Sequence, residues 1–198
     1  MRRITLILLS LSLVLGVLIA TAGATSANDD NGDRAGDIVR WDLSQIVDKV
    51  ILPGGSDVSA ADGETITLTG SGHVEPGERD AFGGGTFVHK NADGTIVAQG
   101  VYHVTAFRSF EALEGGTLAG TGLTDGIADI ETASSGILKV GVKLVTAGGS
   151  PQVDGELTVF CHLPGTIRDI PEGIALEVAG LDFDRQVSGV TIFHILDE

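Results

Sequence analysis

Apolar and polar residues alternate along most of this chain, and the alternation predicts β-strands. Between residues 64 and 74, Ile66 and Leu68 share one face while three threonines share the other. Successive side chains of a strand point to opposite faces of its sheet, so a period of two indicates a half-buried strand. By the same reasoning we predict strands at 38–43, 64–74, 85–90, 95–107, 136–146, 153–163, 173–178 and 187–196.

Turns rich in glycine and proline separate the predicted strands. The segment Asn91–Gly94 ends in Asp-Gly, which is typical of a hairpin turn between two strands.

Two segments depart from the alternation. Residues 44–52 carry apolar side chains at helical spacing, which allows a short N-terminal helix that Pro53 would end. Residues 114–130 are rich in glycine and fit either one further strand or a long loop.

Eight or nine strands without a long helix indicate an all-β fold. One antiparallel sheet of that size either closes into a barrel or folds over as a sandwich. We favour a single antiparallel β-barrel, because glycines inside the predicted strands suit the bends that closure requires. These glycines are Gly70, Gly72, Gly100, Gly141 and Gly189.

The first 27 residues have the features of a cleaved signal peptide. Two arginines precede an apolar run over residues 4–20, and small residues follow it. This order is typical of secretory signals. The run is also just long enough for a retained membrane anchor, which is the alternative. We therefore expect a signal peptide at 1–27, a disordered acidic N-terminus at 28–37 and a β-barrel domain at 38–198, secreted from a bacterial cell.

The chain is strongly acidic. Its 198 residues include 12 Lys and Arg against 27 Asp and Glu, a formal net charge of −15. The leader carries two arginines and no acid, so its removal makes the charge two units more negative. Nucleic acids and anionic membranes select basic surfaces, so we expect neither as a partner of the mature chain. The lone Cys161 excludes a disulfide framework, and we expect a buried thiol.

Three stretches resemble small secreted bacterial all-β proteins that have no assigned function. They span residues 83–105, 154–165 and 187–195, about half of the mature chain. What they share with those proteins is the hairpin pattern. The resemblance implies export and a β fold, with a calycin-like or allene-oxide-cyclase-like barrel as an analogy of architecture alone. It implies no activity.

Four histidines share a local pattern that makes them candidate metal ligands. His89, His103, His162 and His194 each follow an apolar residue two positions earlier, on the same strand face. If those faces line the barrel, the imidazoles would meet at one end, and three or four imidazoles bind Zn, Cu, Fe or Ni. The opposite faces of these strands are more apolar, however, which predicts separate histidines that point to solvent or are individually hydrogen-bonded.

No other group of residues forms a catalytic signature. Asp182 and Asp184 share a strand face, as paired carboxylates of glycosidases can, but Arg185 beside them favours a solvated, charged turn. We therefore expect a non-catalytic binding or structural module without a cofactor, with a small apolar molecule as its ligand. The alternative is a metal-dependent enzyme that holds a divalent metal on the four histidines.

Overall fold

The computed structural model describes residues 37–196. The expected signal peptide and, apart from Asp37, the expected acidic N-terminus lie outside the described residues. The strands are β1 (Ile38–Val47), β2 (Val50–Pro53), β3 (Gly55–Ala60), β4 (Thr65–Glu75), β5 (Asp80–Lys90), β6 (Ile96–Ala112), β7 (Thr124–Asp125), β8 (Ala133–Ser134), β9 (Gly136–Thr146), β10 (Gln152–Cys161), β11 (Gly173–Val178), β12 (Leu181–Ser188) and β13 (Val190–Leu196). A 3₁₀ turn, η2 (Ile130–Thr132), precedes β8.

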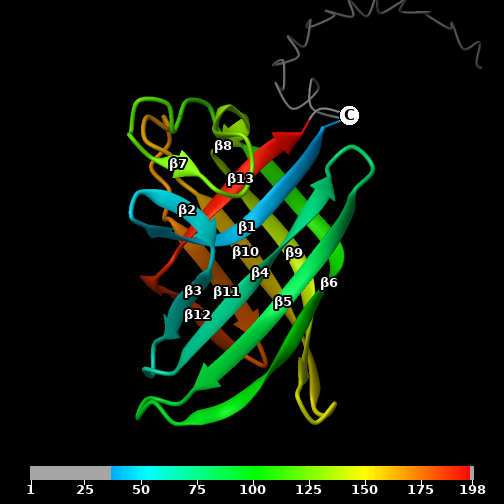
Figure 1. Ribbon diagram of the computed structural model, residues 1–198. Helices are drawn as coiled ribbons and strands as arrows, with labels where there is room; N and C mark the ends of the chain where they lie inside the picture. The colour runs from blue at the N-terminus through cyan, green and yellow to red at the C-terminus, as the bar shows by residue number, and fades with distance from the viewer. Residues whose placement is uncertain (1–36, 197–198) are drawn as a thin grey trace, which may run out of the picture.

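Eight of these strands close into an antiparallel barrel. Their order is β3, β4, β5, β6, β9, β10, β11 and β12, and β12 pairs with β3 to complete the ring. Figure 1 shows the strands tilted around a common axis, as closure of a barrel requires. The prediction of an all-β chain that forms a single antiparallel barrel is confirmed.

Two strands share one edge of β4, one after the other along its length. The first half of β4, residues 65–69, pairs with β3, while residues 71–74 pair with β1. The other edge of β1 pairs with β13 from Ile38↔Leu196 to Ser44↔Val190. The pair β1 and β13 therefore continues the wall beyond the end of β3, at the upper end in Figure 1.

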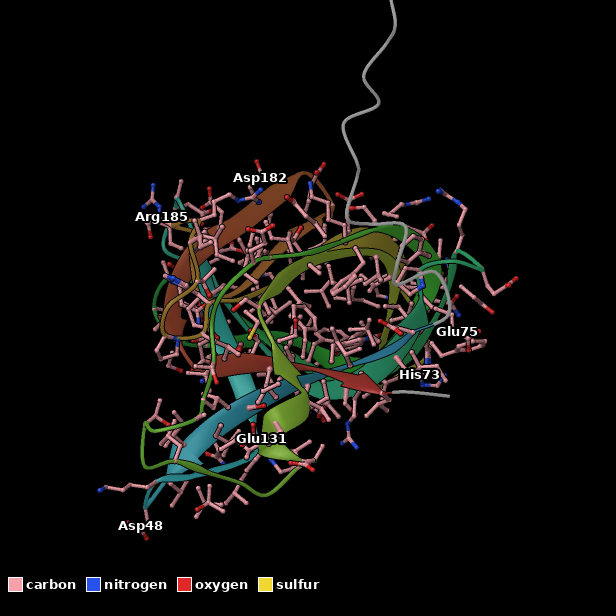
Figure 2. All side chains as sticks on the ribbon, turned by 90° about the horizontal axis from the view of Figure 1, so that it is seen from above. Asp48, His73, Glu75, Glu131, Asp182 and Arg185 are labelled. Carbon is pink, nitrogen blue, oxygen red and sulfur yellow. The ribbon has the colours of Figure 1, made fainter. Side chains whose placement is uncertain are left out.

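Alternate side chains of the strands fill the interior. Leu157, Val159 and Cys161 on β10 are each fully buried, as the period of two predicts. The buried thiol agrees with the expectation for Cys161, and burial raises its pKa. Figure 2 looks down the barrel and shows side chains filling the ring, with the labelled charged residues around its outside.

Facing glycines make room for Trp41, which is fully buried inside the wall. Gly72 on β4 pairs with both Trp41 and Gly83. A Cβ on Gly72 would lie 2.7 Å from the indole Nε1, and one on Gly83 would lie 2.9 Å from the indole ring. Real side chains do not approach so closely, so glycine lets two strands and the indole pack together.

Two local expectations are wrong. Residues 44–52 form no helix but the β1–β2 hairpin, with Asp48 and Lys49 at φ 50° and 68° in its two-residue turn. Positive φ at both central turn positions matches the twist of a hairpin and is incompatible with a continuous helix. The segment around Asp182 is no turn but strand β12, which carries its carboxylates on the outside and Phe183 in the core.

The Gly-rich segment 114–130 is a long loop that contains the two-residue strand β7. β7 pairs in parallel with β2, so this loop lies along the β2 edge of the β1–β2 hairpin. Within residues 37–196, no helix is long and apolar enough to cross a lipid bilayer.

Candidate functional site

An apolar pocket lies inside one end of the barrel. Its lining comes from β4, β5, β6, β9, β10, β11 and β12 and from the turns beside them. Four hairpin connections, those between β3 and β4, β5 and β6, β9 and β10, and β11 and β12, surround this end, which is the lower one in Figure 1. The lining residues are Ile66, Phe87, His89, Ala98, Leu144, Thr146, Pro151, Val153, Val178, Ala179, Leu181 and Phe183.

The pocket holds a volume of about 120 Å³. An engineered cavity of roughly 150 Å³ lined by Leu, Ile and Phe stays dry and binds benzene. The pocket is somewhat smaller than that cavity, so it can enclose at most about one six-membered ring, or the apolar end of a longer molecule that extends from the mouth.

His89 is the titratable side chain in the pocket wall. It follows Phe87 on the inner face of β5, and its ring packs edge-on against Phe183 with centroids 5.5 Å apart. Its Nε2 lies 2.7 Å from Oε2 of Glu64, which directly precedes β4. Because an ionised carboxylate only accepts hydrogen bonds, Glu64 fixes a hydrogen on Nε2 and leaves Nδ1 of a neutral ring as an acceptor.

Thr146 supplies the second polar side chain of the wall, at the end of β9. Its Oγ1 is buried and has no hydrogen-bond partner among the described residues. A buried hydroxyl without a partner costs about 1–3 kcal/mol relative to a satisfied one. The pocket thus contains a hydroxyl that a bound molecule can satisfy.

The remaining lining side chains are apolar, and no Lys or Arg is among them. The Glu64 carboxylate contacts His89 in the pocket wall and so places a charge beside the pocket. An anion in the pocket would therefore lie close to a negative charge without a cation to offset it.

The four histidines predicted as metal ligands lie at separate places. His89 lines the pocket, whereas His103 is exposed on the outer face of β6 and His162 is half-buried just after β10. His194 is fully buried, on the face of β13 opposite the core residue Phe193. Within residues 37–196, no three His, Cys, Asp or Glu side chains come close enough together to hold a metal ion.

His194 belongs to a polar cluster at the upper end of the barrel. Its Nδ1 lies 3.0 Å from Thr132 Oγ1, and its Nε2 lies 3.3 Å from Oδ2 of the buried Asp125. The neighbouring Arg40 donates two hydrogen bonds to the carboxylate of Asp42, at 2.8 and 2.9 Å. Burial lowers the pKa of His194, an effect that outweighs the opposing attraction of Asp125 and Asp42.

His103 is exposed, and His89 and His194 are individually hydrogen-bonded, which are the two arrangements expected of separate histidines. The expectation that the histidine face of each strand is the wetter one is wrong for β5. On β5 the inner face carries Phe87 and His89, while the apolar Val88 lies on the outer face. On β13 the histidine does lie on the outer face, but the loop that contains Asp125 and η2 covers it. Comparing the two faces of one strand does not reveal that a loop distant in the sequence covers one of them.

Glu64 and Thr146 were not predicted from the sequence as site residues. Glu64 is 25 residues from His89 along the chain, so only the β4–β5 pairing reveals their contact. The available signal is that Glu64 falls on the same alternating face as Ile66 and Leu68, directly before a strand.

The fold and the pocket together define a single closed β-barrel with an apolar pocket at one end. No protein-family model, curated protein or solved structure matches the chain.

Proposed function

We propose that this protein is a secreted, non-catalytic binding module that takes a small apolar molecule into the end of its barrel. The observation that carries the proposal is the pocket of about 120 Å³, with mainly aliphatic and aromatic walls. Ligand sites are typically concave, mostly apolar and equipped with a few polar groups, and His89 and Thr146 are such groups here.

Titration with toluene tests this proposal, because toluene matches the pocket in size and carries no polar group. We expect saturable NMR shifts in methyl groups of the lining residues, such as Leu144, Val153 and Val178. The variant Ala98→Leu adds three carbon atoms inside the pocket and should abolish these shifts. Ala119→Leu, on an exposed loop position, is the matched control and should bind as the wild type does.

The proposal is wrong if toluene at its solubility limit leaves the lining methyl groups of the wild type unchanged. Thermal unfolding of both variants accompanies the titration, because overpacking can cost about 1–3 kcal/mol. A folded Ala98→Leu that still binds toluene like the wild type would also contradict the proposed location.

Export is the second part of the proposal. It is supported by the arginines, apolar run and small residues at the start of the chain. Mass spectrometry of protein recovered outside the producing cell should give a chain that begins near Asn28. A membrane-bound protein whose mass includes residue 1 would instead indicate the retained anchor.

A further inference from the structure

We propose that the pocket selects a neutral alcohol, a molecule with one hydroxyl group on an apolar body of about one ring. This inference rests on the proposed binding function and adds the chemistry of the ligand. Three features of the described residues carry it: the direction of hydrogen bonding at His89, the unpartnered hydroxyl of Thr146, and the sign of the nearby charge.

His89 can accept a hydrogen bond from a donor group on the ligand. Glu64 accepts at Oε2 from Nε2, so the ring that lines the pocket has Nδ1 as its remaining polar atom. In the neutral ring Nδ1 carries a lone pair and no hydrogen. A hydroxyl can donate to it, whereas an ether or a hydrocarbon cannot.

Thr146 can donate a hydrogen bond to the oxygen of the same ligand hydroxyl. A hydroxyl both donates and accepts, so Oγ1 of Thr146 can donate to a ligand oxygen. Removing the Thr146 hydroxyl should do no harm to the ligand-free protein, because that oxygen is buried without a partner among the described residues. A ligand alcohol therefore has a partner for its hydrogen and a partner for its oxygen.

The charge and the volume of the pocket argue against anions, cations and larger molecules as ligands. A carboxylate would lie near Glu64 in a pocket with no Lys or Arg among its lining residues. An ammonium group would lose its hydration in a wall of Phe, Leu, Ile and Val side chains. The volume of about 120 Å³ limits the enclosed part to about one ring.

Four probes of nearly equal size separate these alternatives: benzyl alcohol, its isomer anisole, toluene and benzoate. We expect benzyl alcohol to bind most tightly, anisole next and toluene third, with steps of about two- to tenfold, the range of a single net hydrogen bond. Anisole ranks above toluene because its ether oxygen can still accept from Thr146. Benzoate should not bind measurably at neutral pH.

Two variants test the roles of the polar residues by NMR titration of the intact purified protein. Thr146→Val preserves the shape, so anisole and toluene should bind it equally while benzyl alcohol keeps its lead. Glu64→Gln lets the new amide donate to Nε2, which permits the ring hydrogen to move to Nδ1. The preference for benzyl alcohol over anisole should then shrink to less than about twofold. Each variant is therefore read from the ratios of probe affinities within that variant, and thermal unfolding shows that it is folded.

The outcomes separate this inference from the proposed function. If benzyl alcohol, anisole and toluene bind the wild type equally, the alcohol preference is wrong and the apolar pocket stands. Binding of benzoate as tight as that of benzyl alcohol also overturns the preference. If no probe binds, the proposed function fails as well.

Discussion

At the scale of single residues, Glu172 shows how one carboxylate satisfies two strand ends at once. It lies between the end of β10 and the start of β13. Its oxygens accept from the backbone N of His162 at 2.6 Å and from the backbone N of Thr191 at 2.7 Å. Burial raises the pKa of Glu172, and the two backbone hydrogen bonds oppose that effect.

Replacing Glu172 with alanine should destabilise the fold by about 1–3 kcal/mol, because buried donors lose their acceptor. Urea unfolding of the purified protein measures this change. Glu177→Ala is the matched control, since Glu177 is exposed on β11, and it should leave the unfolding midpoint nearly unchanged. Equal midpoints for the two variants would show that Glu172 contributes no more than a surface carboxylate.

From the sequence, His89 was singled out only as a candidate metal ligand, and the residues of an apolar pocket were not predicted. His89 was a candidate because it shares a strand face with Phe87, and both do line the pocket. Glu64 and Thr146 were missed because their significance depends on contacts between strands, and alternation within one strand does not reveal which distant residue lies opposite. The turn at Asp48 was missed because its positive φ angles leave no strong composition signal in an Asp-Lys pair.

At the scale of elements, His194 is one of the points at which the loop between β6 and β9 contacts the barrel. Asp125 in β7 and Thr132 in η2 both contact this ring, while Arg40 and Asp42 on β1 are the other charged groups that act on it. Two residue pairs between β7 and β2, two between β8 and β13, and several backbone hydrogen bonds also hold this loop.

The lowered pKa of His194 predicts a loss of stability in mild acid. The folded state binds a proton at His194 less readily than the unfolded chain, whose ordinary value is 6.5. As the pH falls through 6.5 toward the lowered folded value, the unfolded state gains the proton first, so this contribution to stability is lost. Above the unfolded value the contribution is fully present.

His194→Gln should therefore be destabilised at pH 7.5, by about 1–3 kcal/mol from the lost hydrogen bond to Thr132 and the lost contact with Asp125, and the deficit should shrink at pH 5. Urea unfolding at both values gives the comparison. His103→Gln, at an exposed position, is the control and should follow the wild type at both. A deficit for His194→Gln that is the same at pH 5 and pH 7.5 would contradict the linkage.

Most strands were predictable because each carries an alternation that survives in isolation. Of the eight barrel strands, β3 and β12 were not predicted. β3 is short and has only Val58 and Ala60 as apolar side chains, and the outer face of β12 carries the charges of Asp182, Asp184 and Arg185, with Phe183 alone marking its inner face within that stretch. The sequence allows either a strand or a long loop at residues 114–130, because a glycine-rich segment shows no alternation of apolar and polar residues.

At the scale of the whole molecule, the two ends of the barrel differ in character. The pocket occupies the end ringed by hairpins, whereas Trp41 is fully buried at the end formed by β1 and β13. Gly72, the β4 partner of Trp41, is six residues from the pocket residue Ile66, which is about 20 Å along a strand.

This separation makes the single tryptophan an internal reporter. Its emission should be blue-shifted relative to free tryptophan, poorly quenched by acrylamide, and unchanged when benzyl alcohol or toluene saturates the pocket. Urea should shift it to the red in step with the loss of β-sheet circular dichroism. A ligand-induced shift in the folded protein would place the binding site at the wrong end of the barrel.

The pairing of Ile38 with Leu196 has a practical consequence for orientation. The first and last strands of the described chain, β1 and β13, are neighbours. β1 begins and β13 ends at the end of the barrel away from the pocket (Figure 1). A linker joined at either terminus, whether to a support, a label or a lipid layer, would therefore present the mouth of the pocket outward. The same proximity makes this barrel a suitable scaffold for joining its ends and reopening the chain at a hairpin elsewhere.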